Sequence, residues 1–162
     1  MYPIYEIDDA QAANIIAIQE NYLNDIKARE IKPAKLSETI SAFSNATGGD
    51  VYIGIGEDKV ARTRSWRGFD DPEHANDIFH VLFQAQPFGN HVKFEFLTNK
   101  TLPGLVLHIT VKKVKEIVKS SSGEVFVRVN AGKQKIDTPE KLNTTALSLP
   151  PGTAGDLGEF DT

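Results

Sequence analysis

The fold of this chain is decided by Lys35-Leu-Ser-Glu-Thr-Ile-Ser-Ala-Phe-Ser-Asn-Ala-Thr-Gly-Gly-Asp-Val-Tyr-Ile-Gly-Ile-Gly56. Apolar residues recur at helical spacing in its first half and predict a helix with one apolar face, built on Leu36, Ile40 and Phe43. Gly48 and Gly49 follow, where such a helix needs a left-handed residue to end. Apolar residues then alternate as one face of a strand, at Val51, Ile53 and Ile55. A helix followed by a buried strand indicates an α/β protein.

Working outward, the chain alternates between helix and strand signals. Asp8 or Asp9 can cap a helix over Ala10–Glu20, Pro33 suits the first turn of the next helix, and Asp70-Asp71-Pro72-Glu73 begins another. A short last helix is expected from Thr138-Pro139-Glu140. Apolar alternation predicts further strands over residues 22–30, 60–65, 92–97, 105–112 and 124–129, with a turn at 57–59.

Length and composition favour one folded domain. The chain has 162 residues, and we place the domain at 1–147, with 148–162 as a flexible acidic tail or the start of a linker. The absence of cysteine excludes disulfides and thiolate metal sites. The sequence has neither a signal peptide nor an apolar run approaching the roughly 18 residues of a membrane span. We therefore expect a cytoplasmic protein that does not contact a membrane.

Charge is distributed unevenly along the chain. The net charge is −4, but residues 1–25 hold five acids and residues 148–162 hold three, and neither segment has a base. This leaves 18 basic against 14 acidic residues between 26 and 147. A basic binding face on an acidic protein is compatible with this asymmetry.

Five ordered segments resemble one known family: Asp25-Ile-Lys27, Ile40-Ser-Ala-Phe-Ser-Asn45, Gly48-Gly49, Val51-Tyr-Ile-Gly54 and Val125-Phe-Val-Arg-Val129. In this order they are similar to the Schlafen/AlbA-like (divergent AAA) domain, and the match spans roughly residues 20–142. The resemblance implies an α/β (α+β) fold with a mixed β-sheet flanked by about three to four helices. It also implies binding of DNA or RNA, in a bacterial regulatory or defence protein with further domains.

Basic residues supply the candidates for phosphate contact. Lysine and arginine release counterions from nucleic acid without reading its sequence. The alternation Arg62, Arg64, Trp66 would place two guanidiniums and an indole on one strand face, a surface suited to single strands, although Trp66 could equally be a core residue. The predicted phosphate contacts are Lys27, Arg29, Lys32, Lys35, Arg62, Arg64 and Arg128.

Carboxylates raise a second function, that of a metal-dependent RNA endonuclease. Nuclease members of the family carry two acids five residues apart before a lysine, and Glu20 and Asp25 keep this spacing. The resemblance therefore suggests a catalytic Mg²⁺ or Mn²⁺ site on Glu20 and Asp25, completed by Glu57 or Asp58. The alternative is structural: Asp25 pairs with Lys27 or Arg29, and Glu57 and Asp58 form a turn.

Other signals are weaker. Ser41, Ser44 and Asn45 near the helix end satisfy backbone groups more often than they bind ligands, and we expect Asn45 to tie the helix to a neighbouring strand; the alternative is a polar floor beneath a phosphate. Gly54-Ile-Gly56 lacks the Gly-Lys-Ser/Thr of a Walker-type nucleotide site.

These observations predict a nucleic-acid-binding domain that needs no cofactor for binding. The endonuclease is the first alternative, and a protein-interaction or homo-oligomerisation module is the second.

Overall fold

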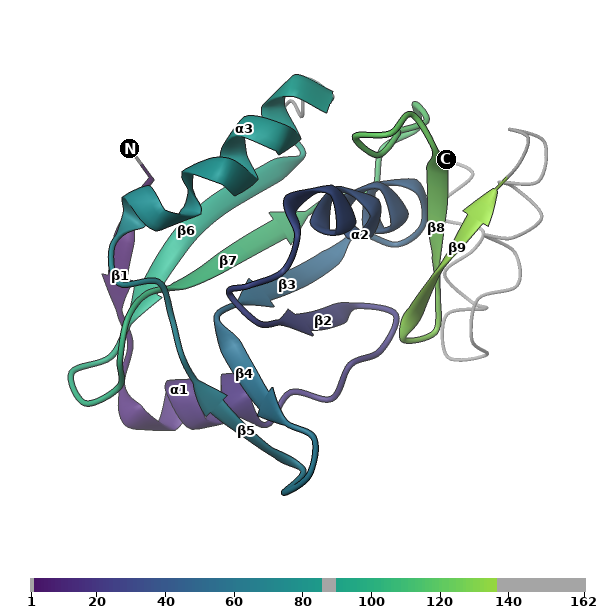
Figure 1. The fold of residues 1–162 in the computed structure, drawn as a ribbon. Coiled ribbons are helices and arrows are strands. Elements are labelled where there is room, and N and C mark those ends of the chain that lie inside the picture. The colour runs from purple at the N-terminus through teal and green to yellow at the C-terminus, as the bar shows by residue number, and fades with distance from the viewer. Residues whose placement is uncertain (1, 86–89, 137–162) are drawn as a thin grey trace.

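A computed structural model describes residues 2–85 and 90–136 of the chain. Its main sheet has five strands in the order β1-β6-β7-β3-β2 (Figure 1). Strands β1 and β6 are parallel, as are β2 and β3, whereas β7 is antiparallel to both of its neighbours. The predicted mixed sheet is therefore confirmed. The strands span Ile4–Glu6 (β1), Asn24–Lys27 (β2), Gly49–Ile53 (β3), Val92–Thr98 (β6) and Val106–Val111 (β7).

Helices cover both faces of the sheet, as Figure 1 shows. Helices α2 (Pro33–Asn45) and α3 (Asn76–Ala85) pack on one face, where their apolar stripes join the inward side chains of β3, β6 and β7. Helix α1 (Asp9–Ile16) packs on the other face with residues of a second, smaller cluster. The larger core centres on Leu36, Ile40 and Phe43, the three α2 residues whose spacing predicted that helix, and all are fully buried.

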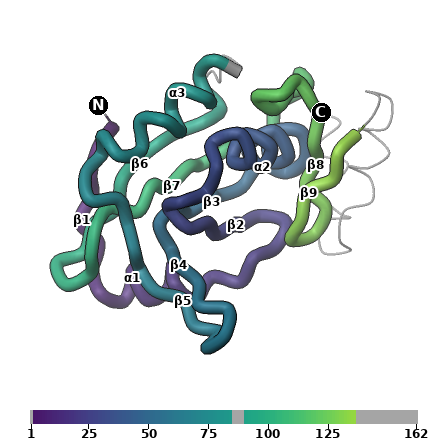
Figure 2. Tube along the Cα trace, viewed as in Figure 1, coloured from purple at the N-terminus to yellow at the C-terminus, as the bar shows by residue number. Residues whose placement is uncertain are grey.

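Two hairpins stand outside the main sheet (Figure 2). One is formed by β4 (Ile55–Asp58) and β5 (Thr63–Trp66), and the other by β8 (Val125–Val129) and β9 (Gly132–Ile136). The second hairpin packs against α2. The first leaves the sheet where β3 ends, and it forms the walls of the clefts described below.

Caps and a proline start the helices where the sequence predicts. The Asp8 side chain accepts a hydrogen bond from the Gln11 backbone at the start of α1. The Asp71 side chain accepts one from Glu73 before a short 3-10 helix (Pro72–Ala75) that leads into α3. Pro33 occupies the first turn of α2, where its missing N–H costs nothing.

Two glycines with positive φ shape the path from α2 to the first hairpin. Gly48, at φ +69°, ends α2, and its N–H donates to the Phe43 carbonyl. Gly54, at φ +122°, interrupts the predicted strand over residues 51–55. Its N–H donates to Lys27 and its carbonyl accepts from Arg67, so the chain turns out of the sheet at Gly54 and continues as β4.

The structure corrects several predicted boundaries. Helix α1 ends at Ile16 and not at Glu20, because the Asn21 side chain accepts from the backbone of Leu23 and Asn24 and turns the chain into β2. Glu57 and Asp58 lie within β4, so the turn begins two residues later than predicted, at Lys59. Strands β1 and β9 were not predicted, since each is short and largely exposed and lacks a buried alternation.

The predicted last helix from Thr138 and the tail over 148–162 lie outside the described residues. Within residues 2–85 and 90–136, none of the helices has the length and apolar character needed to cross a membrane.

Candidate nucleic-acid interface

A buried ion pair lies where β2 meets the second hairpin. Asp25 of β2 and Arg128 of β8 have side chains that are 1% and 2% exposed, and Asp25 Oδ2 lies 3.8 Å from the Arg128 guanidinium. Lys27 Nζ is 3.3 Å from the same oxygen. Burial lowers the pKa of Arg128, but a guanidinium remains charged in proteins. The charges of Asp25, Lys27 and Arg128 therefore pair within the protein.

Glu20 lies beside this pair, and its own pKa is raised there. Burial, followed by the neighbouring Asp25 carboxyl, raises the pKa of Glu20 to about 7, although Lys27 and Arg64 act in the opposite direction. Within the described residues, no group donates to either Asp25 oxygen with good hydrogen-bond geometry. A proton held by Glu20 supplies such a donor. The two acids that sequence spacing singled out therefore do come together.

This arrangement predicts a pH-dependent stability that Glu20→Gln removes. Because the folded state raises the pKa of Glu20, its contribution is fully present below about pH 4.5 and is lost as the pH rises through 7. Solvent screens a side chain that is 31% exposed, so we expect the wild type to lose roughly 1 kcal/mol more than Glu20→Gln over this range. Urea unfolding of both proteins at about pH 5 and about pH 8 measures the difference. Parallel curves would contradict the shared proton.

Glu57 lines the same cleft as Glu20, but the predicted acids of the described residues do not form a metal site. Glu57 and Asp58 lie on β4, and Asp58 Oδ1 accepts hydrogen bonds from the Val60 and Ala61 backbone at 3.0 Å each. Across the described part of the chain, no three histidine, aspartate or glutamate residues are placed to hold a metal ion. With Asp25 also facing two cations, the residues do not fit a Mg²⁺ or Mn²⁺ site.

Two polar clefts flank the first hairpin, one on each of its faces. Their volumes are about 580 and about 570 Å³. Side chains alternate between the faces of a strand, so Arg64 lines one cleft while Thr63 and Ser65 line the other. The basic residues of the first cleft are Lys59, Arg62 and Arg64, and those of the second are Arg29, Lys59 and Arg67.

Some predicted phosphate contacts are engaged within the protein. Arg29 donates to the Gly68 carbonyl at 3.0 Å and pairs with Glu30 at 2.9 Å. Arg64 pairs with Glu20 at 3.8 Å and also donates to the Ile18 carbonyl. These arginines hold the segments around the hairpin together and expose only part of their guanidiniums.

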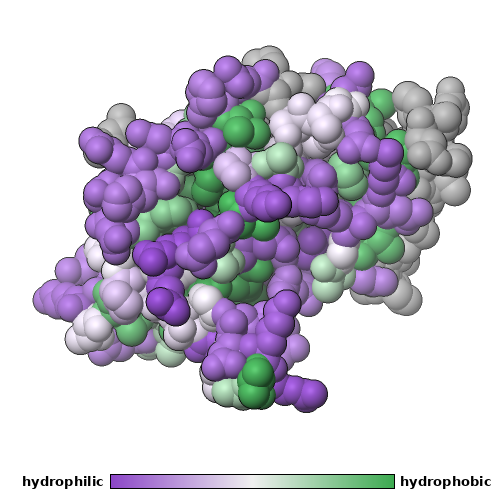
Figure 3. All heavy atoms as spheres, viewed as in Figure 1, coloured by the Kyte–Doolittle hydropathy of each residue, from purple (hydrophilic) through white to green (hydrophobic). Residues whose placement is uncertain are grey.

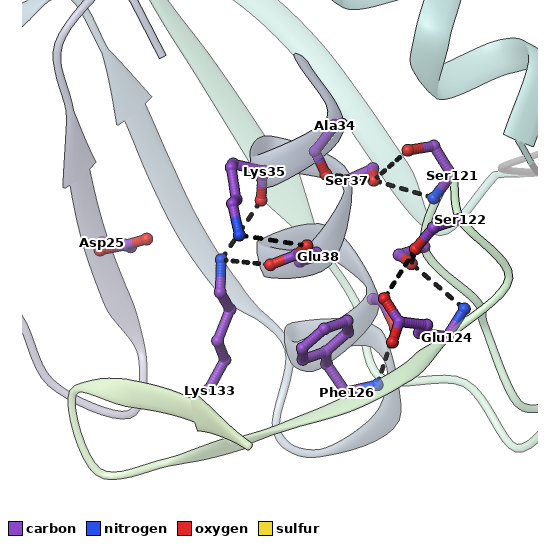
Figure 4. Close-up of polar contacts among 12 residues, drawn as sticks. Asp25, Ala34, Lys35, Ser37, Glu38, Ser121, Ser122, Glu124, Phe126 and Lys133 are labelled. Atoms are coloured by element: carbon purple, nitrogen blue, oxygen red, sulfur yellow. Dashed lines mark hydrogen bonds and ion pairs between the residues drawn. The ribbon is translucent and has the colours of Figure 1, made fainter. Parts of the chain in front are cut away.

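Lys35 lies near the start of α2 (Figure 4). Its side chain is 62% exposed, and its Nζ lies 3.7 Å from Glu38, which also binds Lys133 of β9 at 3.1 Å. Lys32, the residue before α2, is exposed. Both lysines are accessible to a ligand from solvent.

Arg128 is a correction to the sequence prediction, whereas Trp66 takes the core position that was one of its two predicted alternatives. Arg128 is buried, and its guanidinium donates to the Asn21 and Asn24 carbonyls, so it does not face a phosphate from solvent. Trp66 is 2% exposed and donates to the Gly104 carbonyl, which makes it a core residue and not a stacking platform. Arg62 has φ +56° and lies in the turn, so no strand face joins the side chains of Arg62, Arg64 and Trp66.

The polar residues at the end of α2 are structural. The Asn45 amide donates to the Val118 and Phe126 carbonyls and accepts from the Val118 N–H, which confirms the predicted tie to a neighbouring strand. Ser41 donates to Val118, and Ser44 donates to Ile40. With all three side chains buried, they do not form the floor of an open site.

Sequence reasoning missed two exposed or half-exposed cations, Lys59 and Lys133. Lys59 begins the turn of the first hairpin and lines both clefts, and Lys133 lies on β9 beside Glu38. The signal for Lys59 was its place in the turn of a predicted hairpin, because turn residues are exposed. Lys133 lies on a strand that was not predicted, so its partner could not be deduced.

The family assignment follows from comparison with known proteins. The Schlafen, AlbA_2 family model matches residues 20–137, which include the buried ion pair, both hairpins and helices α2 and α3. This chain belongs to the Schlafen AlbA_2 family. The family is associated with nucleic-acid binding. No curated protein matches the sequence closely enough to serve as a relative.

A solved structure with the same fold is the DIP2311 protein from Corynebacterium diphtheriae. It shares 18% sequence identity with this Schlafen AlbA_2 domain at a TM-score of 0.55. The match covers 86% of this chain but 27% of the DIP2311 chain, so this domain corresponds to about a quarter of that protein. At this identity the likeness concerns the fold alone.

Proposed function

We propose that this domain binds nucleic acid through the exposed cations around the first hairpin. The observation that carries this proposal is the placement of Lys59, Arg62 and Arg67 on two adjoining clefts, with no carboxylate of the described residues paired to any of them. Cations without internal partners can neutralise phosphates at little cost. Family membership supports the same function.

Acidic residues in the same clefts limit the affinity. Glu30, Glu57 and Asp58 line the second cleft, and Glu20 and Glu57 line the first. Phosphates must therefore approach the outer rim, which we define as Lys32, Lys59, Arg62 and Arg67. Binding through these cations is expected to weaken as salt is added, with a slope of log affinity against log salt of about −0.9 for each phosphate contact.

The setting that we propose is a cytoplasmic regulatory or defence protein in which this domain is one module. The partial coverage of the DIP2311 chain supports a domain that also occurs within longer proteins.

Loss of two rim arginines tests the proposal. We expect Arg62→Ala combined with Arg67→Ala to reduce affinity for labelled single- and double-stranded nucleic acids about tenfold at low salt, and to reduce the slope of log affinity against log salt by about 1 per lost contact. Fluorescence anisotropy at several salt concentrations measures both. Lys93→Ala is the matched control, since Lys93 is an exposed cation on β6. An equal effect of the control would contradict the rim as the binding surface.

Measurements of cleavage and of self-association separate the two alternative functions. Cleavage of labelled tRNA that requires Mn²⁺ and is abolished by Asp25→Asn would favour the endonuclease over a binding domain. Absence of binding at low salt, together with self-association in sedimentation, would favour an oligomerisation module.

A further inference from the structure

The first hairpin ends in an exposed apolar residue. Val60 lies in the turn between β4 and β5 and is 97% exposed, the highest value among the exposed large hydrophobic residues of the described chain. Figure 3 shows hydrophilic residues along this hairpin and hydrophobic atoms at its free end. A single exposed valine is common on protein surfaces, but this one lies at the end of a hairpin, in the same turn as the exposed cations Lys59 and Arg62.

The tip is held in one conformation. Asp58 Oδ1 accepts from the Val60 and Ala61 N–H groups, which fixes the start of the turn. Arg62 adopts a left-handed conformation at the end of the turn, with φ +56°. At the base, Ile55 pairs with Trp66, and both side chains are buried in the smaller core. A rigid ribbon anchored in the core therefore presents Val60 between the cations Lys59 and Arg62.

We propose that this hairpin enters the major groove of B-form duplex DNA, an inference that rests on the proposed nucleic-acid binding. From the Ile55–Trp66 pair to the Asp58–Thr63 pair the ribbon extends about 10 Å at the usual rise of a strand, and the major groove is about 8.5 Å deep and about 12 Å wide. A two-stranded ribbon fits this groove, whereas the minor groove, about 6 Å wide, excludes it. The two clefts lie on opposite faces of the ribbon, where the two phosphate backbones bordering the groove would run.

The chemistry of the tip agrees with this placement. The Val60 methyl groups offer an apolar contact to the thymine C5-methyl group, which lies in the major groove. Lys59 and Arg62 can donate to guanine or to phosphate, and the exposed carboxylate of Glu57 can accept from the cytosine amino group. The Glu57 carboxylate, which weakens contact with phosphates, is thus compatible with contact to bases. An A-form RNA duplex has a narrow, deep major groove that such a ribbon cannot enter.

The test compares three duplexes of one sequence by fluorescence anisotropy of the wild-type protein: DNA, DNA with uracil in place of thymine, and RNA. We expect the DNA duplex to bind at least about tenfold more tightly than the RNA duplex. Removal of the thymine methyl groups should weaken binding about fourfold, the value of one buried methyl group.

Val60→Ser supplies the matched variant. It should weaken DNA binding and lose the discrimination between thymine and uracil, whereas Ile4→Ser, which truncates an exposed apolar residue on β1, should retain it. Circular dichroism confirms that both variants are folded. Equal affinity for DNA and RNA duplexes, or for thymine and uracil, would overturn the major-groove inference and leave nucleic-acid binding intact. Absence of binding to any nucleic acid at low salt would overturn both.

Discussion

Replacing Asn45 with alanine is expected to lower the free energy of unfolding by about 3 to 4 kcal/mol. The Asn45 side chain is 4% exposed and joins α2 to two segments that are remote in sequence. Its amide donates to the carbonyls of Val118 and Phe126 at 2.8 and 2.9 Å, and its oxygen accepts from the Val118 N–H at 2.8 Å. Alanine would leave the Phe126 carbonyl and the Val118 N–H buried without this partner, and each such group costs about 1 to 3 kcal/mol, whereas the Val118 carbonyl keeps the hydrogen bond from the Ser41 hydroxyl.

Chemical denaturation monitored by circular dichroism measures this loss. Asn14→Ala is the control, because Asn14 lies on α1 with its side chain exposed, and its replacement should change the free energy of unfolding by less than about 0.5 kcal/mol. A similar, small effect at both positions would show that water or rearranged backbone replaces the Asn45 bonds.

Replacing Arg128 with methionine is expected to cost about 3 kcal/mol, near the lower end of the range for breaking a buried ion pair. The methionine keeps most of the packing on Phe43, whose ring centroid lies 4.7 Å from the guanidinium carbon. What is lost is the partner of the buried Asp25 carboxylate and the donor to two backbone carbonyls. Lys27, 3.3 Å from Asp25, compensates in part.

A double-mutant cycle isolates the ion pair from the other roles of Arg128. Because Asp25→Asn removes the uncompensated charge, the double variant Asp25→Asn, Arg128→Met should be less destabilised than the sum of the single variants by about 1 to 3 kcal/mol. Arg62→Met, at an exposed arginine, is the control and should stay within about 0.5 kcal/mol of the wild type. Additive effects would mean that Asp25 and Arg128 do not interact in solution.

Local patterns predicted the elements well where the signal was self-contained. The helical spacing of Leu36, Ile40 and Phe43 predicted α2, and the Asp71-Pro72 pair predicted the start of the following helix. Capping and periodicity act over a few residues, so they can be read without knowing the neighbours in space. Strand β1 escaped prediction because its sheet partner among the described strands is β6, some ninety positions away.

The candidate site was predicted in part. The spacing of Glu20 and Asp25 pointed to a pair that the structure does bring together, whereas Arg62 lies in the hairpin turn beside a cleft and not on the predicted strand face. The prediction of Arg128 as a surface residue was wrong, and the choice between surface and core stayed open for Trp66, because alternation shows which side chains share a strand face but not which face another element covers. Contacts with the carbonyls of Asn21 and Gly104 decide that burial.

By itself, the sequence determined the family, the mixed α/β class and the positions of the three α-helices, because these depend on residue order and on periodicities of a few residues. Tertiary structure alone decided which cations are available to a ligand. Packing of the second hairpin on α2 withdraws Arg128 into a buried pair with Asp25, and the left-handed turn at Gly54 sends the first hairpin away from the sheet. Whether a ligand can reach a cation depends on which distant segments bury its side chain or supply its ion-pair partner. A local sequence pattern does not contain this information.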